Sequence, residues 1–381
     1  MARRGNNEGS THRRNDGRWA AALSLGYQGG HRRRKYLYGR TRAEVALKLH
    51  EAQRTLSDGG ILPTERQTVE TLLQTWLKDS AAPKVRRKTF QRYEEIVRLH
   101  LIPALGSVKL TRLNPAQIEA MLNAALARGV SPRSLTQWRA VLRRALHVAM
   151  RWGWVNRNAA SLAEPPRGED YVVPPLTTAD AQALLLAVKG DRLEALFQVG
   201  LALGLRQSEA LGLRCSDIEL EEGMLSVQRS LQRVAGEWIF NEPKTAKSRR
   251  TLPLPAPLTA ALRQHRNRQL KERLSAGPAW EGSGWGDLVF ADQLGRPLSG
   301  FHVLRRFRSL LALADLPPMR YHDLRHGAPS LMAAQGVPAR LAMELLGHSQ
   351  IATTMNIYTH VTPEDQRQAS ARVSEAIFGG C

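Results

Sequence analysis

The sequence has almost no cysteine and no long apolar run, and each shortage excludes a class of protein. Its two cysteines, Cys215 and Cys381, are too few for a disulfide framework, which favours a reducing compartment. No apolar stretch approaches the roughly 20 residues that a membrane-spanning helix needs. The opening MARRGNNEGS lacks the apolar core of a signal peptide. We therefore expect a cytoplasmic protein.

Acidic residues are also scarce relative to basic ones, and the net charge is +21. Basic and acidic residues number 13 against 5 in residues 1–60, 18 against 7 in residues 61–168, and 24 against 22 in residues 169–381. Such a concentrated excess indicates a polyanionic partner for the first 168 residues. An anionic membrane would need a basic amphipathic helix with an aromatic insertion face, which we do not find. Nucleic acid is therefore the expected partner.

The length of 381 residues and the apolar fraction of 43% predict two or three folded domains. Composition and periodicity place them at residues 1–60, 64–167 and 173–381, with EPPRGEDYVVPP as the linker before the last. The expected fold class is multidomain α+β. A small three-stranded sheet with one helix comes first, then an all-α bundle, then a mixed, mainly α-helical domain with a small antiparallel sheet.

The first domain combines a basic hairpin with one helix. In GRWAAALSLGYQGGHRRRKYLYG, alternation places Arg32, Arg34, Tyr36 and Tyr38 on one face of a strand. A capping box at Thr41 and Glu44 then starts a helix with the apolar stripe Val45, Leu49, Ala52 and Leu56. We interpret the sheet as a DNA reader, the alternative being a solvated basic hairpin.

The second domain is helical by its apolar period. Helix starts are indicated at Asn114-Pro115, with Gln117, and at Ser131-Pro132. Basic residues lie off the apolar stripes or just before the second helix, in KVRRK. Because few acids balance them, phosphate contact is favoured over an ordinary solvated face. The candidate DNA contacts here are Arg86, Arg87, Lys88, Arg143 and Arg144.

The third domain holds five short landmarks in a fixed order. They are GLRQSEALGLRCSDI, NEPKTAKSRRTLPL, YHDLRH, LLGHSQ and NIYTH. They contain, in turn, Arg206 with Glu209, Lys244, His322 with Arg325, His348, and Tyr358. Taken singly, each is weak, and a tyrosine on a helix is most often a packing residue. In this order and spacing the chain resembles the tyrosine recombinases of the phage integrase family along nearly its whole length.

The resemblance implies an arm-type DNA-binding domain, a core-binding domain and a catalytic domain, and it identifies Tyr358 as the nucleophile. Attack on a phosphodiester concentrates negative charge on its oxygens, which the guanidiniums of Arg206 and Arg325 are suited to clamp. His322 is the natural base for the tyrosine hydroxyl, whose reference pKa is about 10. The family's lysine, here Lys244, is expected to protonate the departing 5′-oxygen.

Two further roles follow from the resemblance: His348 hydrogen-bonds a non-bridging oxygen, and Glu209 orients its neighbours. The product is a 3′-phosphotyrosine, which is resealed without ATP, and the sequence has no Gly-x-x-x-x-Gly-Lys loop. We expect no cofactor and no metal. His322 and His326 are four residues apart, but a zinc protease pattern needs glutamate where Asp323 stands.

One departure from the family concerns HGAPSLM, which follows Arg325. Gly327 and Pro329 both disfavour a helix interior. Two outcomes are open: the helix starts late, with Pro329 in its first turn, or it kinks beside Arg325. The departure also keeps open a DNA-binding protein whose recombinase site has decayed. A type IB topoisomerase is a further alternative, although an arm-type domain is not expected there.

The expected partners are double-stranded DNA, with core and arm-type sites, and three further copies of the chain. Thr362-Pro363 predicts the start of a helix with a narrow apolar stripe, Ala369, Val373, Ala376 and Ile377. In the resembling family such tails dock on a neighbouring protomer, which implies a tetramer on synapsed DNA; packing in cis is the alternative. The expected partners also include a directionality factor or a host DNA-bending protein.

Overall fold

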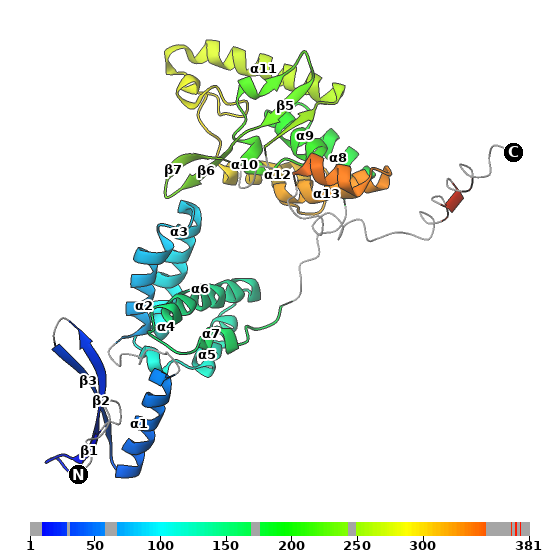
Figure 1. Ribbon diagram of the computed structural model, residues 1–381. Helices are drawn as coiled ribbons and strands as arrows, with labels where there is room; N and C mark the ends of the chain where they lie inside the picture. Colours follow the sequence, from blue (N-terminus) through cyan, green and yellow to red (C-terminus); the bar gives the residue numbers. More distant parts are fainter. Residues whose placement is uncertain are drawn as a thin grey trace. The chain divides into compact units, whose positions relative to one another are not determined.

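The computed structural model describes residues 10–28, 31–57, 67–168, 176–242 and 249–347, and also Arg367, Ser370, Ala371 and Ser374. The chain divides into two compact units, residues 1–170 and 171–381 (Figure 1). The first unit contains two separate apolar cores, one for a small sheet and its helix and one for a helical bundle. No helix among the described residues is both long and apolar enough to span a membrane.

The amino-terminal sheet is antiparallel, in the order β1 (Ser10–Arg13), β2 (Trp19–Gln28) and β3 (His31–Gly39). Helix α1 (Arg42–Ser57) packs on the face of the sheet that carries Ala21 and Leu23, using Val45, Leu49 and Ala52. The opposite face presents Arg34, Tyr36 and Tyr38 to solvent. The predicted alternation is therefore confirmed from Arg34 onward. Arg32 pairs with Tyr27 through the backbone, but its side chain lies outside the described residues.

The helical bundle consists of α2 (Val69–Thr75), α3 (Arg87–Ile96), α4 (Ile102–Leu105), α5 (Pro115–Ala127), α6 (Pro132–Arg151) and α7 (Ala159–Leu162). π-helical turns at Trp76–Ala81 and Val97–Leu101 continue α2 and α3. The predicted caps are confirmed: Asn114 and Gln117 form a reciprocal capping box, and the Ser131 side chain accepts from the amide of Ser134. One detail was wrong: Arg87 and Lys88 belong to the first turn of α3, with Arg86 as its cap.

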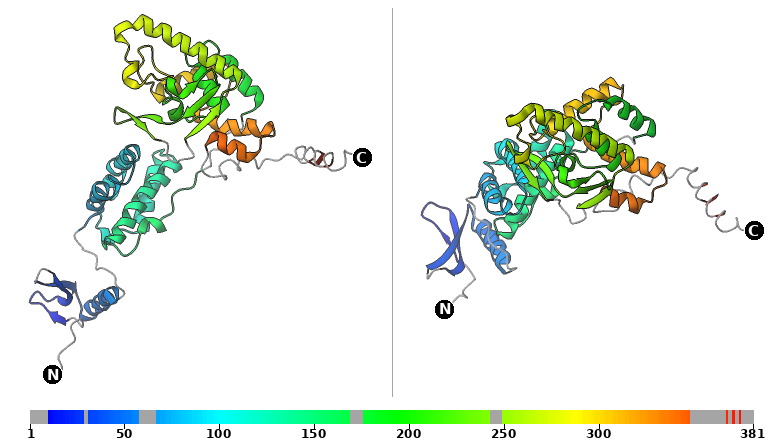
Figure 2. Two further views of the ribbon diagram at one scale, coloured as in Figure 1. Left: turned by 45° about the horizontal axis from the view of Figure 1, so that its top comes forward. Right: turned by 90° about the horizontal axis from the view of Figure 1, so that it is seen from above.

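The second unit begins with α8 (Thr178–Val188), α9 (Glu194–Leu203) and α10 (Gln207–Ala210). One small antiparallel sheet contains β4 (Ile218–Glu219), β5 (Met224–Val227) and β8 (Arg250–Pro253), and another pairs β6 (Ser230–Val234) with β7 (Glu237–Asn241). The chain continues through α11 (Ala256–Ala276), α12 (Gly300–Leu313), α13 (Tyr321–Ala334) and α14 (Ala339–Leu346). Figure 2 shows the same elements from two further directions.

Helix α9 is the centre of this unit. It is buried on most sides, packing against α8, α11 and α13, and α13 in turn packs against α14. Two glycines in the left-handed conformation end helices here: Gly204 after α9, with φ +59°, and Gly347 after α14, with φ +64°. A side chain at Gly204 would also collide with Leu346, because its Cβ would lie 2.3 Å from Leu346 Cδ2. The ends of α9 and α14 are therefore pressed together.

Candidate active site

Arg206 and Glu209 are brought together by local structure. Arg206 caps α10 in an extended conformation, and Glu209 stands at the third helical position. The Glu209 carboxylate accepts from the Arg206 backbone amide at 3.1 Å and from the Arg206 guanidinium at 2.5 Å. The carboxylate is buried, whereas the Arg206 side chain is 38% exposed. Arg206 is thus held by one end of its fork while the rest faces solvent.

Arg325 joins this pair from α13. Its side chain is 2% exposed and lies 4.0 Å from the Glu209 carboxylate. Arg325 Nη1 donates to the Gly204 carbonyl at 2.6 Å, and Nη2 donates to the Leu346 carbonyl. Both carbonyls terminate helices, where the partial negative charge of the helix dipole favours a cation. Because each terminal nitrogen carries two N–H groups, each keeps one for a further acceptor.

Arg250 is a third arginine at the site, and the sequence interpretation missed its importance. Its side chain is 7% exposed, donates to the Glu209 carboxylate at 3.2 Å and donates to the Leu345 carbonyl at 3.0 Å. A signal was available: along β8, Arg250 is in phase with the buried Leu252 and Leu254, so strand alternation points it inward. A charged residue on the apolar face of a strand needs a buried partner.

The three guanidiniums surround the single carboxylate of Glu209, and their charges change its pKa. Burial by itself raises the pKa of Glu209, but the positive charges of Arg250 and Arg206 outweigh that effect and bring the pKa below its ordinary value. Burial lowers the pKa of Arg325 to about 9, and Arg206 contributes to the same shift. At neutral pH the cluster therefore holds three positive charges against one negative charge. This excess is suited to a bound anion.

His322 lies one turn before Arg325 on α13. Partial desolvation of its ring, together with the neighbouring charges of His326 and Arg325, lowers the pKa of His322 to about 4. Its ring lies edge-on to that of His326, with centroids 4.7 Å apart. His322 is thus neutral at physiological pH, the state in which a histidine accepts a proton. No group of three metal-ligating side chains occurs among the described residues.

The preceding residue, Tyr321, is unsuited to act as a nucleophile. Its side chain is 2% exposed, and its hydroxyl donates to the Leu196 carbonyl at 3.2 Å. Burial raises the pKa of Tyr321 well above its ordinary value. The adjacent Asp323 is also engaged, since its carboxylate caps α13 and pairs with Arg320 at 3.1 Å. These two residues anchor the helix start from which His322 and Arg325 project.

The unusual HGAPSLM segment has a structural explanation in part. Helix α13 runs without interruption from Tyr321 to Ala334, so the first of the two open outcomes, a late start with Pro329 in the first turn, was wrong. Gly327 lies against Leu176, the first described residue of this unit: a Cβ at Gly327 would lie 2.7 Å from Leu176 Cβ. Glycine is therefore required by close packing. Pro329 is buried within the helix and cannot donate to the Arg325 carbonyl.

Three of the predicted site residues, Lys244, His348 and Tyr358, lie outside the described residues. Their flanks are described. Lys244 falls in the connection between β7 and β8, as expected for a lysine between strands, and Arg250 begins the second of these strands. His348 follows Gly347, whose Cβ position would be 3.0 Å from Arg250 Nη1. The connection that contains Lys244 therefore leads into the strand that Arg250 begins, and the segment that contains His348 starts at a residue beside Arg250.

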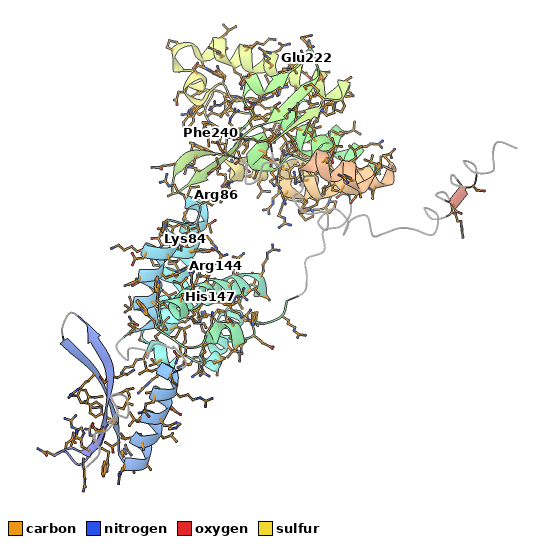
Figure 3. The ribbon with its side chains drawn as sticks, in the orientation of Figure 1. Lys84, Arg86, Arg144, His147, Glu222 and Phe240 are labelled. Carbon is orange, nitrogen blue, oxygen red and sulfur yellow. The ribbon has the colours of Figure 1, made fainter. Side chains whose placement is uncertain are left out.

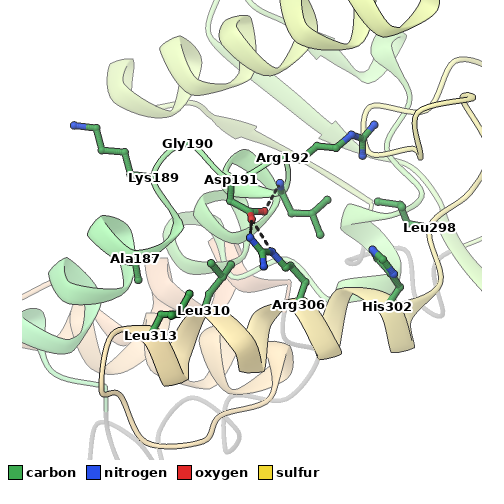
Figure 4. Close-up of a pocket in the computed structure, with 11 residues that line it drawn as sticks. Ala187, Lys189, Gly190, Asp191, Arg192, Leu298, His302, Arg306, Leu310 and Leu313 are labelled. Carbon is green, nitrogen blue, oxygen red and sulfur yellow. Dashed lines mark hydrogen bonds and ion pairs between the residues drawn. The ribbon is translucent and has the colours of Figure 1, made fainter. Parts of the chain in front are cut away.

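Another hollow in this unit, with a volume of about 600 Å³, contains none of the predicted residues (Figure 4). It is lined by Lys189, His302 and Leu310 among others. Its carboxylate, Asp191, is occupied, because it accepts from Arg306 at 2.7 Å and from the Leu193 amide at 2.8 Å. We therefore place the candidate site at the arginine cluster instead.

The candidate DNA contacts of the bundle are all at its surface. Arg86, Arg87 and Lys88 are exposed at the start of α3, and Arg143 and Arg144 are exposed on α6. Figure 3 labels Arg86 and Arg144. The guanidinium of Arg144 lies 5.8 Å from the centroid of the Tyr93 ring and donates to its hydroxyl. Arg143, Arg144 and His147 line one pocket of about 560 Å³ with Arg92. Basic residues from α3 and α6 thus line one concave surface.

Comparison with known proteins agrees with this geometry. Residues 175–365 match the phage integrase family, and residues 68–126 match the phage integrase N-terminal SAM-like domain. An integrase of Streptomyces ambofaciens is 34% identical over 355 residues, covering 90% of this chain and 89% of the relative. A XerC-like tyrosine recombinase of Caldanaerobacter subterraneus subsp. tengcongensis is 30% identical over 352 residues, covering 88% and 90%.

Two solved structures show the same fold. The Tn1549 transposon integrase in complex with circular intermediate DNA superposes with a TM-score of 0.68 at 22% identity, covering 81% of this chain and all of that one. A lambda integrase dimer bound to a core site has a TM-score of 0.56 at 20% identity, covering 94% and 96%. The expected fold class, with its small sheets and helical bundle, is confirmed. The chain belongs to the phage integrase family and is a tyrosine-type site-specific DNA recombinase.

Proposed function

We propose that two guanidiniums of the arginine cluster, those of Arg206 and Arg325, bind the scissile phosphate of a DNA strand that Tyr358 attacks to form a 3′-phosphotyrosine. The observation that carries this proposal is the gathering of Arg206, Arg325 and Arg250 around the single carboxylate of Glu209. Such an excess of positive charge in a partly buried site attracts a phosphodiester and stabilises the charge that grows on it during attack. The partly exposed guanidinium of Arg206 is one of the two that contact the phosphate, and the guanidinium of Arg325 is the other.

The remaining steps use one base and one acid. His322, neutral at physiological pH, accepts the proton of the Tyr358 hydroxyl as the new oxygen–phosphorus bond forms. The bond from phosphorus to the 5′-oxygen then breaks, and Lys244 gives that oxygen a proton. His348 hydrogen-bonds a non-bridging oxygen, and Glu209 holds Arg206 in place. Since one phosphate ester replaces another, attack by a different 5′-hydroxyl reseals the strand without ATP.

A catalytically decayed DNA-binding protein is the less favoured alternative. It was suggested by Gly327 and Pro329, which follow the second arginine. Helix α13 is nevertheless continuous, Arg325 is anchored by two carbonyls, and Gly327 is explained by its contact with Leu176. These features are compatible with a working site.

The domain assignment that we propose gives residues 1–60 to arm-type sites, residues 64–167 to core sites and residues 173–381 to catalysis. In the first, DNA contacts are assigned to Arg34 and Tyr36 on the exposed face of β3 and to Arg32, whose side chain lies outside the described residues. In the second, they are assigned to Arg86, Arg87, Lys88, Arg143 and Arg144. The exposure of those whose side chains are described, and the excess of basic over acidic residues in the first 168 residues, support the assignment.

We also propose a cytoplasmic enzyme that is a monomer in solution and a homotetramer on synapsed double-stranded DNA, assisted by a directionality factor or a DNA-bending protein. Arg367, Ser370, Ala371 and Ser374 are helical and exposed, as on the outer side of the predicted tail helix. The stripe Ala369, Val373, Ala376 and Ile377 lies outside the described residues. Sedimentation on synaptic DNA tests the tetramer: a chain ending at Thr362 that still assembles fully and cleaves normally would show that the tail is dispensable.

The central experiment compares two tyrosines. Tyr358→Phe removes one hydroxyl and no charge, so we expect DNA binding to persist and the covalent complex to disappear. A suicide DNA substrate analysed on a denaturing gel measures the adduct. The matched control is Tyr321→Phe, which removes the buried hydroxyl of the residue that precedes His322 in the sequence and should leave adduct formation intact. Persistent adduct in Tyr358→Phe, or its loss only in Tyr321→Phe, would refute the assignment.

A further inference from the structure

Arg250 carries an inference that deepens the proposed function and rests on it. A buried guanidinium is costly unless its N–H groups are satisfied, so its partners show what it holds in place. Two partners belong to the site: the Glu209 carboxylate at 3.2 Å and the Leu345 carbonyl at 3.0 Å. They come from elements far apart in sequence, α10 and the last turn of α14.

The contact with Glu209 acts on Arg206. Arg250 and the Arg206 backbone amide both donate to Oε2 of the carboxylate, which leaves Oε1 for the Arg206 side chain. The plane of the carboxylate is thereby fixed from two directions. Within the described part of the chain, the Arg206 guanidinium is held at one terminal nitrogen, so its orientation follows the orientation of Glu209.

The contact with Leu345 acts on the end of α14. The carbonyls of Leu345 and Leu346 accept from Arg250 and Arg325 respectively. Gly347 then turns the chain with φ +64°, and its Cβ position would be 3.0 Å from Arg250 Nη1, which leaves no room for a side chain without displacing Arg250. The next residue is His348. Arg250 thus sets the point from which the segment bearing His348 and Tyr358 departs.

We propose that Arg250 is a positioning residue for strand cleavage, which aligns Arg206 through Glu209 and fixes the exit of the chain from α14. It does not touch the phosphate itself. A lysine at this position retains the charge but is a point donor without the planar fork, so it is unable to hold both partners in the same geometry. Misplacement of catalytic groups by about 1 Å costs on the order of 10²-fold in rate.

The test is Arg250→Lys in the full-length protein, assayed for single-turnover adduct formation on a suicide substrate. We expect core-site affinity within about threefold of the wild type and a cleavage rate about 100-fold lower. The decisive readout uses a methylphosphonate at the scissile position, in which a methyl group replaces one non-bridging oxygen and the linkage carries no charge. Because such a substrate depends less on Arg206, the penalty of Arg250→Lys should shrink to a few-fold. An equal penalty on both substrates, or none on either, would overturn the proposal.

Arg192→Lys is the matched control. Arg192 is also partly buried, grips Glu272 with two nitrogens at 2.8 and 2.7 Å and donates to the Ala291 carbonyl at 2.7 Å, yet contacts none of the site arginines. Arg192→Lys should lower the stability of the protein without altering the ratio of its cleavage rates on the phosphodiester and the methylphosphonate substrates. If Arg250→Lys does not fold, Glu209→Gln is measured by the same ratio. Failure of the wild type to form any adduct would instead refute the proposed function.

Discussion

Gly327→Ala is expected to destabilise α13, although alanine favours helices over glycine. The added Cβ would lie 2.7 Å from Leu176 Cβ and 3.0 Å from its Cδ2, whereas carbon atoms pack at about 3.5–4.0 Å. Overpacking of this kind costs about 1–3 kcal/mol. The higher helical propensity of alanine stabilises the helix by about 1 kcal/mol and offsets part of this cost. The expected net effect is that α13 loses about 1 kcal/mol of stability.

Hydrogen exchange of the α13 amides measures this effect locally, which avoids treating a multidomain chain as two-state. A loss of about 1 kcal/mol lowers amide protection roughly fivefold. We also expect slower adduct formation, by up to about 100-fold, because α13 carries His322 and Arg325 and must move by roughly 1 Å. DNA affinity should not change.

A second substitution, at Leu176, tests whether this collision is the cause, because the added Cβ at residue 327 lies nearest to Leu176 Cβ. Leu176→Ala keeps the nearest atom, Cβ, so it should not rescue Gly327→Ala, whereas Leu176→Gly removes that atom and should rescue it. In the Leu176→Gly background we expect Gly327→Ala to be neutral or stabilising. If Gly327→Ala in the wild-type background instead raised the local stability of α13 by about 1 kcal/mol, as at an unhindered helical site, this reasoning would be refuted.

Three other predictions concern the site and the arm. Pro329→Ala restores an N–H donor for the Arg325 carbonyl and should raise protection of α13, since an interior proline costs about 3 kcal/mol; lower protection would mean that the buried proline ring matters more. NMR titration of His322 without DNA should give a midpoint near 4, so that its contribution to stability is complete above pH 6.5 and is lost as the pH falls towards 4; a midpoint above 6 would contradict the description of its surroundings. A truncated protein starting at Thr64 should lose the arm-site footprint and keep the core-site footprint, and identical footprints with the full chain would remove the case for a separate arm domain.

Much of the local structure was determined by the sequence alone, because it depends on neighbours within one helical turn or one strand. The capping box of Asn114 and Gln117 and the alternation of β3 are both short-range patterns. The contact of Arg206 with Glu209 belongs here too, because residues three apart meet on one side of a helix start. The five landmarks sufficed to indicate the family, and with it the chemistry.

Only the tertiary structure decided what surrounds those landmarks. Arg250 and Glu209 are 41 residues apart, and Arg325 and Gly204 are 121 residues apart, so no local pattern predicts that they meet. The glycine in HGAPSLM looked like a defect because its reason, Leu176, approaches from a distant part of the chain. Helix propensity describes only the intrinsic cost of a glycine within its own helix. The packing that compensates for this cost exists only once α13 lies against its neighbours.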